Sequence, residues 1–236
     1  MKTAIILAAG IGSRLMPLTE DKPKSCVKVN GEEIIKKIVS QLIKFQSEIK
    51  IYVVIGHFGN EIKKVLSDFE EYIVYVENEN YKQTNNMESC RLALDARTES
   101  SGSLIINADC IYDDEIIQAI LERQTNTIAA DIGRYEAENM KIKFKDSRVE
   151  EISKEIKPGE SVATSIDLYF FTEKTLNILR KIMNSFKEVG MTNLWNEVAI
   201  DAALKKEVVE FIDISGLRWM EIDNHEDLKI AVDLFK

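Results

Sequence analysis

Apolar residues follow two alternating periods along the first half of the chain. Residues 3–8 form a continuous, partly β-branched apolar run that ends at glycines, which predicts a strand buried on both faces. Over residues 32–45 the apolar side chains recur three and four positions apart, which predicts a helix. Residues 49–55 then read as a second buried strand, so a helix connects two strands of one sheet.

The same alternation continues to residue 107. The pattern predicts helices at 60–69 and 87–96 and strands at 72–76 and 103–107, the last leading directly into Asp109. Strands alternating with helices of about ten or more residues indicate an α/β fold. We therefore expect a Rossmann-like three-layer sandwich with a mostly parallel central sheet. Its ligands should lie at the carboxyl ends of the strands, where residues 10–24 and 108–114 fall.

From about residue 127 the pattern changes to shorter apolar pieces. Strand-like segments at 127–132, 141–144, 148–152 and 161–171 predict a small mixed or antiparallel section. Helices are expected at 173–186 and 194–205, a strand at 208–214 and a final helix from His225. No Ser/Gly-rich linker divides the chain, so residues 1–236 read as one domain with a change of character near residue 125.

Composition and charge narrow the class of protein. The chain is 45% hydrophobic and 30% charged with a net charge of −9, and its basic residues are scattered, so we expect no nucleic-acid partner. The longest apolar run, residues 4–9, is far shorter than the roughly 20 residues of a membrane span. We expect a cytoplasmic protein with no membrane insertion. Cys26, Cys90 and Cys110 lack metal-site spacing and read as reduced core thiols.

The segment after the first predicted strand carries the strongest functional signal. Residues 7–19 read LAAGIGSRLMPLT, and Pro23 and Lys24 follow. Glycines at the end of a strand let the backbone approach a polyphosphate, and the exposed N–H groups can bind an anion. Arg14 and Lys24 add positive charge for a transferring phosphoryl group. A dinucleotide fingerprint would need a further glycine near Leu15 and a P-loop would need a Gly-Lys-Ser/Thr ending, and neither is present.

This string resembles the nucleotidyltransferases of the sugar-nucleotide pyrophosphorylase type, which include cytidylyltransferases acting on phosphocholine and related head groups. The resemblance implies the nucleotide-diphospho-sugar transferase fold, with nucleotide binding in residues 1–125 and acceptor binding in residues 126–236. It also implies that the glycine-rich loop wraps a nucleoside triphosphate and that Arg14 and Lys24 contact its phosphates as catalytic residues.

Residues 81–89, YKQTNNMES, resemble the N-N-x-x-S pattern of phosphocholine cytidylyltransferases, which favours CTP. Asparagine side chains offer the donors and acceptors that a cytosine edge needs, although an asparagine there could instead cap the following helix. The predicted nucleotide-binding residues are Leu7, Ala8, Ala9, Gly10, Gly12, Ser13, Tyr81, Asn85, Asn86, Ser89 and Ala108.

Two aspartates match the metal positions of the same family. Asp109 follows the strand at 103–107, and Asp223 lies in residues 221–228, EIDNHEDL, which resemble a C-terminal E-I-D-x-x-E-D-L segment. Two carboxylates suit Mg²⁺ that bridges substrate phosphates. A helix N-cap is the alternative role for Asp223.

The acceptor is expected in the second half of the chain. Lys154 matches a lysine that the family places near the acceptor phosphate, whereas Lys141 sits in an alternating strand and could simply face water. Aromatic side chains would cage a quaternary ammonium, and carboxylates would suit a primary amine. The acceptor-binding candidates are Tyr135, Lys141, Lys154, Asp167, Trp195 and Trp219, and the aromatic ones could equally belong to the core.

The sequence thus predicts a Mg²⁺-dependent cytidylyltransferase. It would transfer CMP from CTP to a small phosphorylated or phosphonylated head group such as phosphocholine or 2-aminoethylphosphonate, releasing pyrophosphate. One alternative is a sugar-1-phosphate nucleotidyltransferase that uses UTP, dTTP or GTP. A second is a non-catalytic nucleotide-binding regulatory protein. The sequence does not decide between a monomer and a homodimer.

Overall fold

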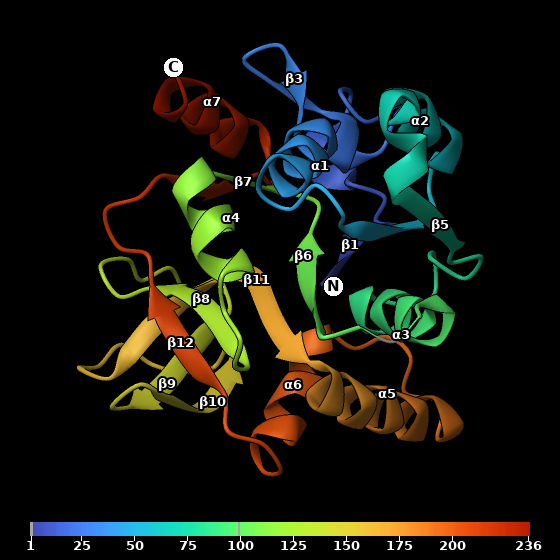
Figure 1. Cartoon of the computed structure of the whole chain (residues 1–236). Helices are drawn as coiled ribbons and strands as arrows, with labels where there is room; N and C mark the ends of the chain where they lie inside the picture. The colour runs from blue at the N-terminus through green and yellow to red at the C-terminus, as the bar shows by residue number, and fades with distance from the viewer. Residues whose placement is uncertain (1, 99) are drawn as a thin grey trace.

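One nine-stranded sheet runs through both halves of the molecule in the computed structural model, which describes residues 2–98 and 100–236 (Figure 1). The first half supplies four parallel strands. In sheet order these are β5 (Ile73–Glu77), β4 (Lys50–Ile55), β1 (Thr3–Ala8) and β6 (Gly102–Asn107). The expected parallel sheet of the first 125 residues is therefore confirmed.

The second half extends the sheet with mixed strand directions. Strand β11 (Val162–Thr172) runs antiparallel beside β6 and joins the two halves. Next come β8 (Thr127–Asp131), β12 (Glu210–Asp213), β10 (Arg148–Ser153) and β9 (Lys141–Lys145). Only β8 and β12 pair in parallel here, and β9 also pairs with β11, so these five strands curl back on themselves. The expected mixed section is confirmed.

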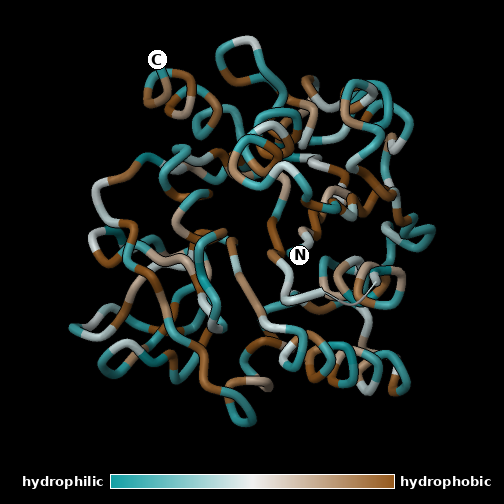
Figure 2. The backbone as a smooth tube through the Cα atoms, in the orientation of Figure 1, coloured by the Kyte–Doolittle hydropathy of each residue, from teal (hydrophilic) through white to brown (hydrophobic). Residues whose placement is uncertain are grey.

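Helices cover both faces of the sheet because alternate residues of its central strands are apolar on opposite sides. Ala4 and Ile6 of β1 pack into one buried cluster, and Ile5 and Leu7 pack into the other. Hydrophobic stretches accordingly lie on the inner sides of many helices (Figure 2). The first cluster includes residues of α1 (Ile34–Phe45), α2 (Gly59–Val65), α4 (Asp114–Leu121) and α7 (His225–Leu234). The second includes residues of α3 (Asn86–Ala96), α5 (Glu173–Glu188) and α6 (Asn196–Leu204).

Short elements account for the differences from the expected pattern. The helix expected at 60–69 ends at Val65, and a 3₁₀ helix, Ser67–Tyr72, follows it. The pattern also missed two short strand pairs, because two or three residues are too few to show a period. One is β2 (Lys28–Val29) with β3 (Glu32–Glu33), and the other is β7 (Cys110–Tyr112) with β13 (Trp219–Glu221).

Two further observations concern the sequence predictions. Cys26, Cys90 and Cys110 are buried and free, as expected for core thiols. In the parts of the chain described, residues 2–98 and 100–236, no helix is both long and apolar enough to cross a membrane.

Candidate active site

A cavity of about 360 Å³ lies where β1 and β6 end, as expected for a parallel sheet. It brings together segments that are far apart in the sequence. All eleven predicted nucleotide-binding residues line it, together with Arg14, Lys24, Asp109, Lys154, Asp167, Trp195 and Asp223. The structure therefore gathers most of the predicted site residues around one space, while their roles remain predictions.

The glycine-rich loop folds tightly between β1 and Lys24. Gly12 has a φ of 70°, and a Cβ on it would lie 2.7 Å from the Cβ of Lys24, so only glycine fits there. The hydroxyl of Thr19 donates to the Gly12 carbonyl at 2.9 Å, and a 3₁₀ turn, Ser13–Leu15, follows. This packing sets Arg14 and Lys24 on the same side of the loop as the cavity.

Lys24 contacts both predicted metal ligands. Its Nζ donates to Asp109 Oδ2 at 2.8 Å and to Asp223 Oδ1 at 2.5 Å, and Arg14 pairs with Asp223 Oδ2 at 2.7 Å. Burial by itself would lower the pKa of Lys24, but the charges of Asp109 and Asp223 together outweigh burial and raise it. Burial also opposes the low pKa of Asp223, which is set by Lys24 and Arg14. Lys24 and Asp223 are therefore charged at neutral pH.

The β7–β13 strand pair holds the two aspartates together across 114 positions of sequence. Glu221 lies opposite Cys110 in this pair, and the Ile222 N–H donates to the Asp109 carbonyl at 2.9 Å. Carboxylate oxygens of Asp109, Glu221 and Asp223 lie within 4.8 Å of one another. Oxygen ligands at this spacing fit a hard divalent cation such as Mg²⁺. The residues that would hold the ion therefore include Glu221 beside the two predicted aspartates.

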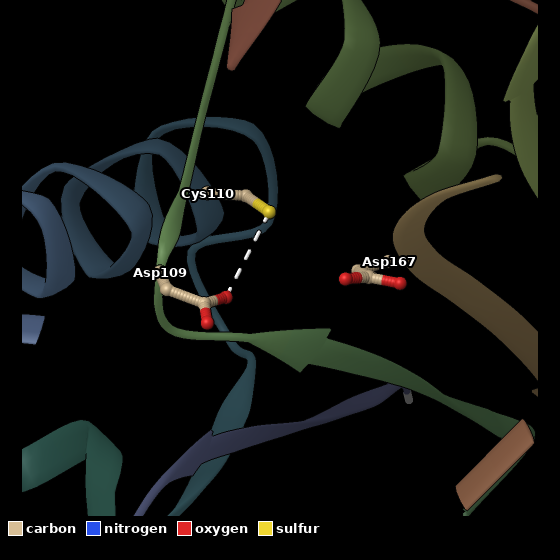
Figure 3. A group of neighbouring side chains, drawn as sticks. All are labelled: Asp109, Cys110 and Asp167. Atoms are coloured by element: carbon tan, nitrogen blue, oxygen red, sulfur yellow. Dashed lines mark hydrogen bonds between the residues drawn. The ribbon is translucent and has the colours of Figure 1, made fainter. Parts of the chain in front are cut away.

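A second group of acids faces Asp109 from the neighbouring strand. Asp167 projects from β11 toward Asp109 and Cys110, and the buried Cys110 thiol donates to Asp109 Oδ1 at 3.8 Å (Figure 3). The pairing of β11 with β8 shifts register between Ser165 and Tyr169, and Asp167 has a φ of 59°. Such irregularities re-aim side chains near functional sites. Here the irregularity directs Asp167 into the cavity.

Tyr169 connects Asp167 to Glu197 at the start of α6. Its hydroxyl lies 3.1 Å from Asp167 Oδ1 and 2.8 Å from Glu197 Oε1, and it accepts a hydrogen bond from Ser165. Burial and the charge of Asp109 raise the pKa of Asp167 to about 6. Burial and the charge of Asp167 raise the pKa of Glu197 to about 8. Burial, reinforced by Asp167 and Asp109, raises the pKa of Glu221 to about 9.

The asparagines that begin α3 form another wall of the cavity. Asn85 is the N-cap residue, and its Oδ1 accepts from the Asn86 N–H at 2.8 Å. The Oδ1 of Asn86 accepts from the Asn196 N–H at 2.9 Å and so caps α6. Ser89 accepts from Asn78 at 3.0 Å. Asn85 therefore caps the helix that follows it, as the alternative role predicted, whereas Asn86 caps α6 instead. Neither Nδ2 group has a hydrogen-bond partner among the described residues.

Lys154 and Trp195 form the part of the wall that belongs to the second half of the chain. The Lys154 ammonium lies 4.7 Å from the centre of the Trp195 ring, and Trp195 remains 44% exposed. A lysine stacked on an aromatic ring keeps its charge available for an anionic ligand. This placement is compatible with the predicted role of Lys154 at the acceptor phosphate.

Three predicted acceptor residues do not line the cavity. Lys141 is fully buried and donates its ammonium to the carbonyls of Glu136 and Ala137, so it neither faces water nor reaches a ligand. Trp219 is buried, and its indole N–H donates to Asp131 at 2.9 Å. Tyr135 donates to the Ile156 carbonyl at 3.2 Å. Each of them therefore has a structural partner within the protein. The sequence could not predict these partners, because alternation along a strand predicts which face a side chain lies on but not what it contacts.

Several cavity residues were missed by the sequence reasoning, chiefly Asn78, Asn139, Glu197 and Glu221. Glu221 stands two positions before Asp223 in the same motif, so the sequence offers it as a further metal ligand, although the family resemblance points only to the aspartate. Glu197 had almost none: one glutamate among the apolar residues of a helix is ordinary, and only the fold shows that it is buried.

Comparison with known proteins shows similarity over almost the whole chain. A family model described as nucleotidyl transferase matches residues 3–233. The bifunctional IPC transferase and DIPP synthase of Aquifex aeolicus is 25% identical over 98% of this chain and 51% of its own length. The 2-aminoethylphosphonate cytidylyltransferase of Lancefieldella rimae is 36% identical over 48% of this chain and 45% of its own. The chain thus spans about half the length of the first of these curated relatives.

A solved structure resembles the whole fold. It is a CTP:phosphocholine cytidylyltransferase from Streptococcus pneumoniae, with a TM-score of 0.81 and 22% identity over 100% of this chain and 99% of that chain. The expected resemblance to this group of proteins and the expected fold class are confirmed.

Proposed function

Because this chain belongs to the nucleotidyl transferase family, we propose that it transfers the cytidylyl group of CTP, with Mg²⁺, to a small phosphorylated or phosphonylated acceptor and releases pyrophosphate. The observation that carries the proposal is the contact of Lys24 with Asp109 and Asp223 at the mouth of the glycine-rich loop. Cations suited to phosphates and carboxylates suited to a metal ion line one cavity there, which supports the proposal because a transferring phosphoryl group requires both.

The reaction needs no base from the protein. A phosphate monoester is largely dianionic at neutral pH because its second pKa is about 6. One of its oxygens forms a bond to the α-phosphorus, while the bond from that phosphorus to the bridging oxygen breaks and pyrophosphate leaves with the electron pair. Mg²⁺, when bound, would neutralise phosphate charge and help to orient the phosphates. Arg14 and Lys24 would bind phosphate oxygens, and the loop N–H groups would hold the triphosphate in position.

The donor pattern at the start of α3 supports CTP. The Oδ1 atoms of Asn85 and Asn86 already accept backbone hydrogen bonds. The groups that these side chains offer to a ligand are therefore chiefly their Nδ2 donors. Cytosine presents two adjacent acceptors, O2 and N3, to such donors. Uracil presents an N–H at position 3, which an Nδ2 donor cannot satisfy. The unpaired donors therefore favour cytosine over uracil, and hence CTP over the UTP of a sugar-1-phosphate nucleotidyltransferase.

A non-catalytic nucleotide sensor is the remaining alternative. A sensor would not need two carboxylates held across 114 positions by a dedicated strand pair, nor a lysine between them. Joint retention of Arg14, Lys24, Asp109 and Asp223 in one cluster supports catalysis instead.

A pyrophosphate-release assay tests the proposal. Four nucleoside triphosphates would be crossed with phosphocholine, phosphoethanolamine, 2-aminoethylphosphonate and glucose 1-phosphate, with and without Mg²⁺. We expect release with CTP and at least one of the first three acceptors, and only when Mg²⁺ is present. Preference for UTP with the sugar phosphate would contradict the proposal, as would tight nucleotide binding without release for any pair.

A further inference from the structure

The buried carboxyl groups of Glu197 and Asp167 form a polar pocket that has no counter-charge among the described residues. Both acids are more than nine-tenths buried and both line the cavity. The single hydroxyl hydrogen of Tyr169 is the donor available to both Asp167 Oδ1 and Glu197 Oε1. Tyr169 has one hydroxyl hydrogen and can donate it to only one of the two carboxyl groups at a time. Asn107 also forms a hydrogen bond with Asp167, but neither Tyr169 nor Asn107 carries a positive charge, so neither supplies a counter-charge to the buried acids.

No cation among the described residues supplies that counter-charge. Within residues 2–98 and 100–236, neither Asp167, Glu197 nor Glu221 forms an ion pair. The cations that face them are otherwise engaged, since Arg14 and Lys24 pair with Asp223 and Asp109. Lys154 lowers the pKa values of Asp167 and Glu197 slightly but stacks on Trp195 without reaching either acid.

A divalent ion does not account for the pocket either. The two groups of described acids close enough to share an ion are Asp109, Glu221, Asp223 and Asp109, Cys110, Asp167. Glu197 belongs to neither group. A metal ion held by either group would therefore leave Glu197 without a counter-charge.

We propose that the acceptor carries a primary ammonium group, which donates hydrogen bonds to Glu197 and Asp167. A primary ammonium brings one positive charge and three N–H donors, which matches two buried carboxyl groups that lack a counter-charge. This inference rests on the proposed function, because it concerns the second substrate of the same cavity.

A quaternary ammonium suits the pocket less well. Trimethylammonium groups have no N–H and are bound by several aromatic faces. The aromatic residues lining the cavity are Tyr81 and Trp195. Tyr81 stands on the wall next to His57, with ring centres 5.7 Å apart, and the Trp195 ring is already covered by Lys154. A methylated head group would thus bring no N–H donor to either carboxyl group.

Three acceptors of similar length separate these possibilities: phosphoethanolamine, phosphocholine and ethyl phosphate, each assayed with saturating CTP. We expect kcat/KM for phosphoethanolamine to exceed that for the other two by roughly 10- to 100-fold, the factor for leaving buried polar groups unpaired. Glu197→Gln should remove most of this preference by raising KM for phosphoethanolamine while leaving KM for CTP unchanged. Glu188→Gln, at the exposed end of α5, is the matched control and should behave as wild type.

The outcomes distinguish this inference from the proposed function. Turnover that is equal or better with phosphocholine or ethyl phosphate would overturn the inference while the cytidylyl transfer stands. An unchanged preference in Glu197→Gln, with the variant folded by circular dichroism, would overturn the assignment of this residue. Pyrophosphate release with UTP and glucose 1-phosphate, but with none of these three acceptors, would overturn both.

Discussion

Lys24 is the residue at which the glycine-rich loop and the carboxylate cluster meet. Its ammonium group contacts both Asp109 and Asp223, and burial leaves it only 14% exposed. A divalent ion and a triphosphate entering this cluster would give the lysine and the aspartates new partners with the same charges. The residue can therefore stay charged both with and without its substrates.

Replacing this lysine tests its role directly. We expect Lys24→Ala, and separately Arg14→Ala, to lower kcat by at least about 100-fold, the scale of losing one donor to a transition state. Steady-state pyrophosphate release measures the effect. Lys22→Ala, two positions away, should retain most of the activity, because Lys22 pairs with Asp21 and not with Asp109 or Asp223. Rates near wild type in both Lys24→Ala and Arg14→Ala would exclude the loop as the catalytic cradle.

Helix α3 connects the cavity wall to the neighbouring helix α5. Its first residues, Asn85 and Asn86, face the cavity, while Arg91 on its buried side forms a two-pronged ion pair with Glu88 at 2.7 Å. Arg91 also contacts Asn184 of α5 at 3.2 Å. The cavity wall formed by Asn85 and Asn86 is thus fixed to α5 by a buried, charged side chain.

Removing this arginine should destabilise the protein strongly. Arg91→Ala leaves Glu88 buried without a partner, which costs about 3–5 kcal/mol of unfolding free energy. Urea denaturation followed by circular dichroism measures the loss. Lys64→Ala breaks the exposed pair with Glu61 and should cost less than about 1 kcal/mol. A loss below 1 kcal/mol in Arg91→Ala would mean that Glu88 finds water or another donor.

At the scale of the whole molecule, the titration of Glu197 should make the free energy of unfolding depend on pH. The pKa of Glu197 is about 8 in the folded protein against 4.5 for the free side chain. Between these values the folded state binds more protons than the unfolded state, so stability contributed by this group is present below about pH 4.5 and is lost as pH rises toward 8.

Glu197→Gln should therefore gain stability relative to wild type as pH increases from 5 to 8, by at most about 1.4 kcal/mol per pH unit. Thermal or urea unfolding at several pH values, without ligands, measures the difference, and Glu188→Gln again serves as the control. A difference between Glu197→Gln and wild type that does not change with pH would show that Glu197 is ionised throughout.

Much of this architecture could be predicted because its signals are local. The strand at Thr3–Ala8 and the glycine-rich loop after it are contiguous in sequence, so composition and spacing were enough. Non-local features could not be found in this way. The hydrogen bonds of Lys141 and Trp219 and the burial of Glu197 depend on which chain segments come to lie beside them. The three-residue strands β7 and β13 show no period of their own, although they assemble the carboxylates.

That strand pair also imposes an order on biosynthesis. While the ribosome is still adding residues, a nascent chain that has passed Asp109 but not reached Asp223 has the complete glycine-rich loop but only one of the two aspartates that contact Lys24. Under the proposed function, such a chain lacks one of the two expected metal ligands and should not catalyse transfer. Competence would therefore arise late in translation, when residues 219–223 pair with residues 110–112.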